Sequence, residues 1–108
     1  MVVGDVDVGA GEALIAEIDR KGQGLFQRTD ICDWKSLQDL FSAARERFRS
    51  IDIVYANAGM AERPPFLYDD IFSEDGTLAE PSFRLVDVNV NGVMRSKYTL
   101  QHNHVKRR

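Results

Sequence analysis

Two features near the N-terminus could bind a nucleotide, a glycine-rich turn and an acidic side chain. The first six residues are short and apolar, as in a buried parallel strand, and the string GAGEAL follows at 9–14. A phosphate-binding turn requires the pattern G-x-G-x-x-G between a strand and a helix, so that the backbone can approach the pyrophosphate. Here Leu14 occupies the place of the third glycine, and the carboxylate of Glu12 would repel phosphates. The glycine-rich turn is therefore only a partial match.

Asp5 is the acidic candidate. In dinucleotide-binding folds, the acid that binds the adenosine ribose lies at the end of the second strand. Asp5 stands at such a strand end. Its carboxylate could accept hydrogen bonds from the ribose hydroxyls and would repel a 2′-phosphate, which favours NAD over NADP. The alternative is an acid that contacts water or caps the next helix, and this stretch alone leaves both interpretations open.

The spacing of apolar residues predicts alternating strands and helices around these candidates. Short runs rich in β-branched and aromatic residues predict strands at 1–6, 25–28 and 51–56. Apolar residues at helical spacing predict helices at 12–20, from Trp34 to Phe48 after an Asp33 cap, and from Pro81 nearly to the end. The stretch from 61 to 80 predicts an irregular surface loop. Strands separated by helices favour right-handed crossovers and a parallel sheet.

Three further motifs resemble those of the short-chain dehydrogenase/reductase family. The run DIVYANAG at 52–59 is similar to the family's Asn-Asn-Ala-Gly motif after strand four, with Ala56 in place of the first Asn. Asp30-Ile31 resembles the Asp-Val pair that borders the adenine ring, and VNVNG at 88–92 resembles the Asn-x-x-Gly segment. The order and spacing of these motifs extend the resemblance over nearly the whole chain.

The resemblance implies a fold and a site. The fold would be α/β, a partial Rossmann-type three-layer arrangement with parallel strands equivalent to the family's second, third and fourth, and with flanking helices. Residues 1–108 would form a single partial dinucleotide-binding domain. Asn89 would be the Asn of the catalytic tetrad, which supports a proton-relay water. The adenosine and ribose of NAD, in preference to NADP, would lie against Asp5, Val6, Asp30, Ile31, Asn57, Ala58 and Gly59.

Other parts of the family pattern are not found in these 108 residues. Family members have a glycine-rich loop before the matched region, and a catalytic Ser and a Tyr-x-x-x-Lys segment after it. Tyr98 is followed four residues later by His102 instead of Lys, so we interpret Tyr98 as a packing residue. The resemblance therefore implies an internal fragment of an oxidoreductase for alcohol or carbonyl substrates that is inactive as this chain alone. Whether the chain is itself an enzyme stays open.

A non-catalytic binding or regulatory module is the alternative. In the doubly wound order the first strand lies between the second and the fourth, so the strands at 1–6 and 51–56 would each face a gap of one strand. Exposed strand edges favour aggregation or pairing with another chain, either a second copy or a sheet-completing partner. A small flavodoxin-like domain without a cofactor would leave the motifs unexplained.

Composition excludes several other classes. A chain of 108 residues with 44% hydrophobic and 29% charged residues has the make-up of one globular domain. A net charge of −3 gives no reason to expect nucleic acid, and no apolar run approaches the ~20 residues of a membrane span. His102 and His104 do not share a helix face, so no metal site is expected. The single Cys32 excludes an internal disulfide and, without a signal-peptide pattern, favours the cytoplasm.

Overall fold

The computed structural model describes residues 1–19, 21–61 and 72–105, and its architecture is α/β. Strand β1 (Val2–Asp5) pairs in parallel with β2 (Leu25–Arg28), and helix α1 (Val8–Ile18) forms the crossover between them. The register places Val2 opposite Leu25 and Asp5 opposite Arg28. The predicted fold class, parallel strands with flanking helices, is confirmed.

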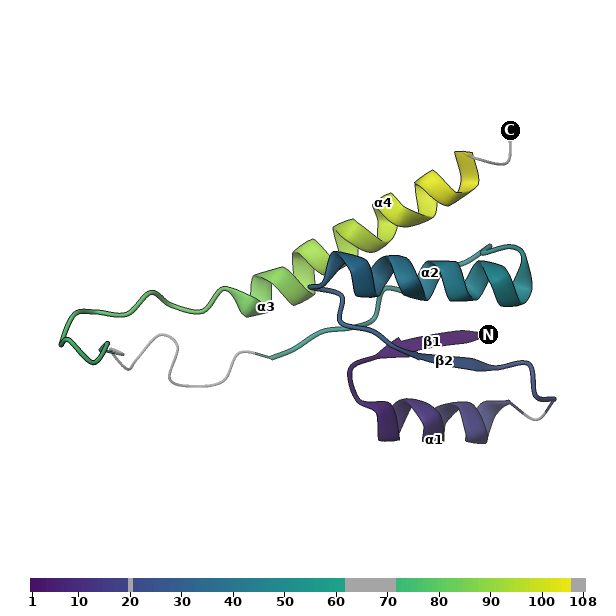
Figure 1. Ribbon diagram of the computed structural model, residues 1–108, viewed down its shortest axis with the longest axis horizontal. Helices are drawn as coiled ribbons and strands as arrows, with labels where there is room; N and C mark the ends of the chain where they lie inside the picture. The colour runs from purple at the N-terminus through teal and green to yellow at the C-terminus, as the bar shows by residue number, and fades with distance from the viewer. Residues whose placement is uncertain (20, 62–71, 106–108) are drawn as a thin grey trace.

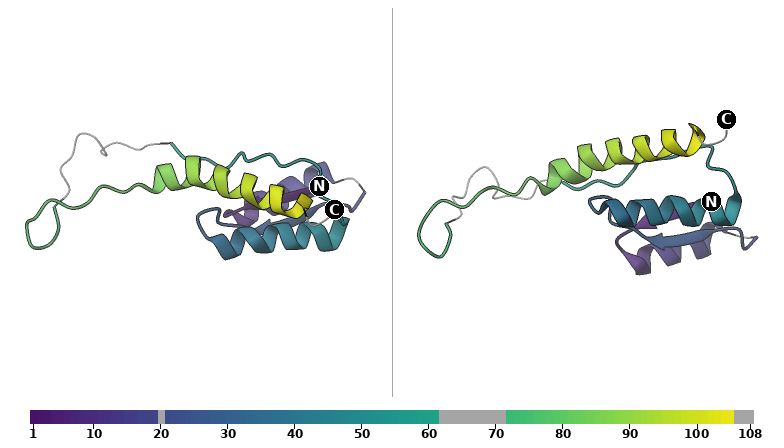
Figure 2. Two further views of the ribbon diagram at one scale, coloured as in Figure 1. Left: turned by 90° about the horizontal axis from the view of Figure 1, so that it is seen from above. Right: turned by 45° about the horizontal axis from the view of Figure 1, so that its top comes forward.

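Helices cover both faces of this small sheet. Helix α1 lies on one face and α2 (Trp34–Phe48) on the other (Figures 1 and 2). The predicted cap of α2 is confirmed, because Asp33 Oδ1 accepts a hydrogen bond of 2.9 Å from the backbone N–H of Lys35. The buried hydrophobic side chains of the described residues all come from α2: Leu37, Phe41 and Ala44. One face of α2 therefore supplies the centre of the core.

Helix α1 begins earlier than its apolar spacing predicts. Asp7 caps it by accepting a 2.9 Å hydrogen bond from the N–H of Ala10, so the helix starts at Val8 and contains both Gly9 and Gly11. The predicted start at residue 12 is wrong, and the glycines do not form a turn between strand and helix. Gly11 is buried, and a Cβ atom there would lie 2.0 Å from Cε2 of Phe26 on β2. The glycine thus permits close packing of α1 on the sheet.

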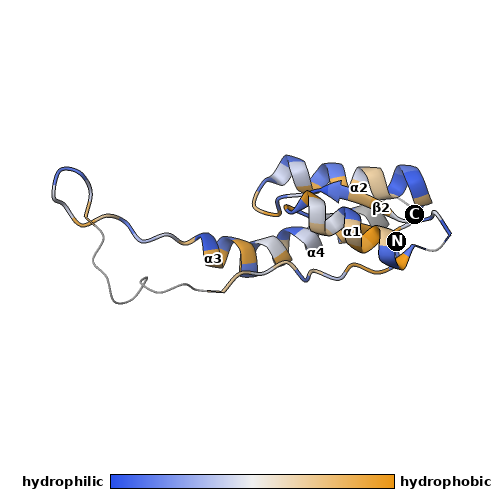
Figure 3. Cartoon of the chain, turned by 90° about the horizontal axis from the view of Figure 1, so that it is seen from below, coloured by the Kyte–Doolittle hydropathy of each residue, from blue (hydrophilic) through white to orange (hydrophobic). Residues whose placement is uncertain are grey.

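The predicted strand at 51–56 is wrong. Residues 51–61 follow α2 in the same direction as the two strands, but they form neither helix nor strand (Figure 1). A strand needs a neighbour for its backbone hydrogen bonds, and the part of the chain that the structure describes offers none here. Ile53 and Tyr55 are consequently 86% and 85% exposed, and the hydrophobic residues of this segment are visible in Figure 3.

The predicted long C-terminal helix is confirmed, with an interruption. It consists of α3 (Arg84–Val86), a π-helical turn η1 (Asp87–Asn91) and α4 (Gly92–Val105). The π turn closes with a hydrogen bond from the N–H of Gly92 to the carbonyl of Asp87. Helix α4 packs on α2. Of the predicted loop, residues 62–71 lie outside the described residues, and 72–80 are irregular apart from one bridge between Phe72 and Leu78.

Candidate functional site

The carboxyl ends of β1 and β2 lie at one edge of the sheet (Figure 1). Asp5 ends β1 and Val6 follows it, while Asp30 and Ile31 follow β2. The two strand ends are joined because the N–H of Thr29 donates a 2.8 Å hydrogen bond to the carbonyl of Asp5. Ligands of open α/β sheets bind at this edge. The structure therefore brings four of the predicted cofactor residues to the expected edge.

Asp5 itself is exposed to solvent. Its Oδ1 accepts a 2.9 Å hydrogen bond from the N–H of Asp7, and Asp7 caps α1. Of the two alternatives to a ribose acid, the helix cap is therefore wrong, and an acid that contacts water is not tested. Val6, with 53% of its surface exposed, lies beside it.

Asp30 organises the loop between β2 and α2. Its Oδ1 accepts a 2.9 Å hydrogen bond from the N–H of Cys32, and its Oδ2 lies 3.7 Å from a guanidinium nitrogen of Arg84. The Ile31 side chain packs on the C-terminal helix at Gly92, where a Cβ atom would lie 2.3 Å from Cδ1 of Ile31. The loop is thus fixed against the helix that carries Asn89.

Asn89 lies in the π turn and holds the segment that follows the predicted Asn-Ala-Gly motif. Its Oδ1 accepts a hydrogen bond from the N–H of Met60, and its Nδ2 donates to the carbonyl of Met60, both at 2.9 Å. A Cβ atom on Gly59 would lie 3.4 Å from Asn89 Oδ1. Asn57, Ala58 and Gly59 are exposed. The side chain of Asn89 therefore attaches this motif to the helix.

Asp87 is a residue of this region that sequence reasoning missed. Its Oδ1 accepts hydrogen bonds of 3.0 Å from Asn91 Nδ2 and 3.0 Å from Arg95, and its carboxylate also accepts one from the Cys32 thiol. The hydrogen bonds from Asn91, Cys32 and Arg95 hold the pKa of Asp87 below its usual value. Only the pair with Asn91, four residues apart on a helix, has a spacing that could have indicated an interaction.

Cys32 is half-buried, and we expect it to react slowly with alkylating reagents. Burial, followed by the hydrogen bond to Asp87 and the charges of Asp87 and Asp30, raises the pKa of the Cys32 thiol from 9.0 to about 11. The thiolate is the reactive form. The rate of reaction with iodoacetamide should therefore begin to increase at a higher pH in the folded chain than in the chain unfolded in urea. The unfolded thiol ionises first, so the free energy of unfolding should fall as the pH rises from 9.0 to about 11.

The control for this measurement is built into the chain, because Cys32 is its single cysteine and every modified molecule reports that site. Mass spectrometry of samples quenched at successive times gives the rate at each pH. Identical pH profiles for the folded and the urea-unfolded chain would contradict the raised pKa.

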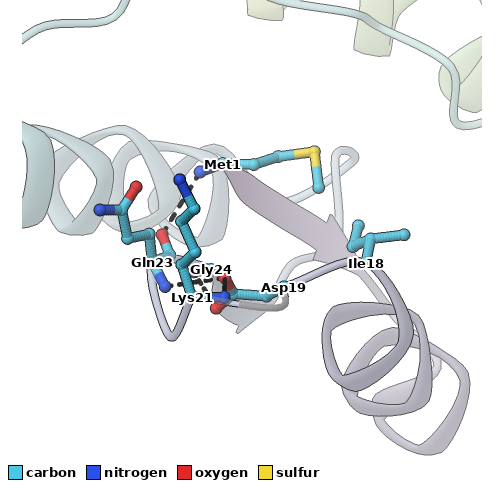
Figure 4. Close-up of a pocket in the computed structure, with 6 residues that line it drawn as sticks. All are labelled: Met1, Ile18, Asp19, Lys21, Gln23 and Gly24. Carbon is cyan, nitrogen blue, oxygen red and sulfur yellow. Dashed lines mark hydrogen bonds between the residues drawn. The ribbon is translucent and has the colours of Figure 1, made fainter.

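A pocket lies at the opposite end of the sheet, where the strands begin, and it belongs to the turn between α1 and β2. It is lined by Met1, Ile18, Asp19, Lys21, Gln23 and Gly24 (Figure 4). The carboxylate of Asp19 accepts backbone hydrogen bonds from Gly24, Gln23 and Lys21, which lower its pKa. This acid closes the turn between α1 and β2 at the amino ends of the strands. The pocket therefore lies away from the edge where such folds bind ligands.

The fold, two parallel strands joined by a helix and covered by helices on both faces, is consistent with part of a Rossmann-type α/β domain. The sequence model of the family described as short chain dehydrogenase matches residues 1–107, so the chain belongs to this family. Members of the family bind NAD or NADP and act on small-molecule substrates.

Individual relatives agree with this assignment. The chain is 40% identical over 78 residues to the short-chain dehydrogenase/reductase prx4 of Penicillium roqueforti, a match that covers 71% of the chain and 22% of the relative. It is 28% identical over 78 residues to the short-chain dehydrogenase/reductase ATR7 of Stachybotrys chlorohalonatus, covering 72% and 23%.

Another relative matches more of the chain. The cis-4-hydroxycyclohexanecarboxylate dehydrogenase of Sinomonas cyclohexanicum is 32% identical over 104 residues, covering 94% of the chain and 39% of the relative. The matches thus span between 22% and 39% of the length of these relatives. Within the described residues, no helix is both long and apolar enough to cross a membrane.

Proposed function

We propose that the chain carries the adenosine side of an NAD site in an oxidoreductase of the short-chain dehydrogenase family. The residues of this site would be Asp5, Val6, Asp30, Ile31, Asn57, Ala58 and Gly59. The observation that carries the proposal is the exposed carboxylate of Asp5 at the carboxyl end of β1, with Asp7 acting as the helix cap in its place. Asp5 would accept hydrogen bonds from the adenosine-ribose hydroxyls. A 2′-phosphate beside this carboxylate would be repelled, which favours NAD over NADP.

The other predicted residues would complete this side of the site. Asp30 and Ile31 would border the adenine, with the loop supported by Arg84 and Gly92. Asn57, Ala58 and Gly59 would lie along the ribose, held in place through the bonds between Asn89 and Met60. The site fits an adenosine because Asp5 offers a charged hydrogen-bond acceptor at an exposed strand end.

The cofactor, when bound, would accept or donate the hydride that converts an alcohol to a carbonyl compound or the reverse. Among the tetrad residues of the family, only Asn89 has a match in these 108 residues. We therefore propose that the chain by itself binds the cofactor without transferring hydride. The single cysteine fits a reducing compartment such as the cytoplasm.

A calorimetric titration of the purified 108-residue chain tests the proposal, with circular dichroism on the same sample to verify folding. We expect saturable binding of NAD and of adenosine monophosphate, weaker binding of NADP, and no binding of nicotinamide mononucleotide. A folded chain that binds none of these ligands would contradict the cofactor site. Oxidation of an alcohol by this chain with NAD would contradict the proposed lack of hydride transfer.

A second candidate is a non-catalytic module that completes its sheet with a strand from another chain. It is favoured by the sheet of the described residues, in which β1 is paired on one edge only, and by the exposure of Ile53 and Tyr55. An unpaired edge of this kind is a template for strand addition. Sedimentation of the purified chain distinguishes the two candidates: a stable dimer without NAD supports the module, and a monomer that binds NAD supports the cofactor site.

A further inference from the structure

The side chain of Asp87 links the C-terminal helix to the loop after β2. Along the helix it accepts hydrogen bonds from Asn91 and Arg95, and across to the loop it accepts one from Cys32. Arg95 also donates a 3.4 Å hydrogen bond to the carbonyl of Ile31. Asp87 and Arg95 thus form one polar cluster with the loop residues, which we call the Asp87 cluster (Asp87, Asn91, Arg95, Cys32).

The position of Asp87 in the helix gives this cluster its importance. Asp87 is the first residue of the π turn, and Asn89 lies two residues later in the same turn. Turns of this type are rare and are frequently found at functional sites, where the inserted residue changes the direction of the side chains. The hydrogen bonds from Asn91 and Arg95 to one carboxylate span the turn from its beginning to the first turns of α4. They therefore hold the turn in the geometry that lets Asn89 pair with Met60.

Two further contacts join the loop to the C-terminal helix. A guanidinium nitrogen of Arg84 lies 3.7 Å from Asp30, and Ile31 packs against Gly92. The π turn, the loop and the segment after 57–59 are consequently connected through Asp87 and Asn89 in series. A shift of the π turn would move both the loop after β2 and the segment after residues 57–59, which border the proposed adenosine site.

We propose that Asp87 is a positioning residue, which holds the π turn so that the Asn89 amide binds the Met60 backbone and which, through Arg95, ties this turn to the loop at Ile31. The link to a cofactor rests on the proposed function. The contact between Asn89 and Met60 does not, because it can be measured on the chain without any ligand.

Amide hydrogen exchange of Met60 is the direct readout, because its N–H donates to Asn89. We expect Asn89→Ala to expose this amide, and Asp87→Asn to accelerate its exchange roughly tenfold. The double variant should exchange no faster than Asn89→Ala, because Asp87 acts on Met60 through Asn89. In Asp87→Asn, the pH profile of Cys32 alkylation should also move toward that of an ordinary thiol, because the negative carboxylate that accepts a hydrogen bond from the thiol is replaced by a neutral amide.

Asp39→Asn is the matched control, since Asp39 is a helical acid that pairs with Lys35 on α2, outside the cluster. It should leave Met60 exchange and the alkylation profile unchanged. If Asp87→Asn does not fold, Arg95→Gln removes the partner of Asp87 in α4 and should accelerate Met60 in the same way. Unchanged Met60 exchange in a folded variant, or equal acceleration of the amides between β1 and β2, would overturn the proposal. A wild-type chain that fails to bind NAD would overturn the proposed function alone.

Discussion

Replacement of Asp5 by alanine is expected to weaken NAD binding by roughly 10- to 100-fold, because a hydrogen bond to a charged group contributes about 1.5–3 kcal/mol. The carboxylate is exposed at the carboxyl end of β1, and within the described residues it accepts one hydrogen bond, from the N–H of Asp7. Loss of that bond affects the turn between β1 and α1 only locally. Most of the effect should therefore appear in the affinity for the ribose, measured by calorimetry.

Asp5→Asn separates charge from hydrogen bonding. The amide oxygen can still accept from Asp7 and from a ribose hydroxyl, but the negative charge is gone. Affinity for NAD should fall less than in Asp5→Ala, and the ratio of NADP to NAD affinity should rise because a 2′-phosphate is no longer repelled.

The matched control is Asp52→Ala, since Asp52 is also an exposed acid and its hydroxyl partner is Ser50 at 3.4 Å. It should bind NAD as the wild type does. If Asp5→Ala and Asp52→Ala have the same affinity for NAD as the wild type, Asp5 is not the ribose acid.

Gly11→Ala is expected to destabilise the chain by about 1–3 kcal/mol, the range for an extra methyl group in a well-packed core. The new Cβ would lie 2.0 Å from Cε2 and 2.4 Å from Cδ2 of Phe26, so α1 or the aromatic ring would have to move. Phe26 lies on β2, two residues before its carboxyl end. Thermal unfolding followed by circular dichroism should show a lower melting temperature.

Gly9→Ala provides the comparison within the same helix. A Cβ at residue 9 would meet only Asp7 Oδ1 at 3.7 Å, an ordinary contact. Since alanine favours a helix over glycine by up to about 1 kcal/mol, this variant should be as stable as the wild type or more stable. Phe26→Leu should relieve part of the damage in Gly11→Ala, because the two residues share one contact. Equal melting temperatures for Gly9→Ala and Gly11→Ala would contradict the packing role of Gly11.

The local sequence determined those elements whose type and bounds depend on residues only a few positions apart. The strand at 25–28 was predicted with the bounds of β2, and Asp33 was predicted as the cap of α2, because a short side chain before an amphipathic run interacts with its own neighbours. The helix that carries Asn89 was predicted from apolar residues at helical spacing. Motif order also led to the family to which the chain belongs.

Other elements depended on partners far away in the chain. Residues 51–56 have the composition of a strand, but a strand also needs a neighbour, and the described residues place none beside them. Gly9 and Gly11 resemble a phosphate-binding turn in sequence, whereas the cap at Asp7 places both inside α1 and Gly11 packs against Phe26 of β2. The absent neighbour of residues 51–56 and the contact of Gly11 with Phe26 both concern another element.

The sequence by itself therefore determined the family, the local elements and the identities of Asp5, Asp30 and Asn89 as candidates. Only the tertiary structure decided how these residues are held. Two α-helical turns span about 7.2 residues, so in a regular helix Asp87 and Arg95, eight apart, would be offset around the axis by nearly one residue. The residue added by the π turn brings them onto one face, at 3.0 Å. Spacing rules assume regular geometry, and the contacts around Asn89 arise where that geometry is interrupted.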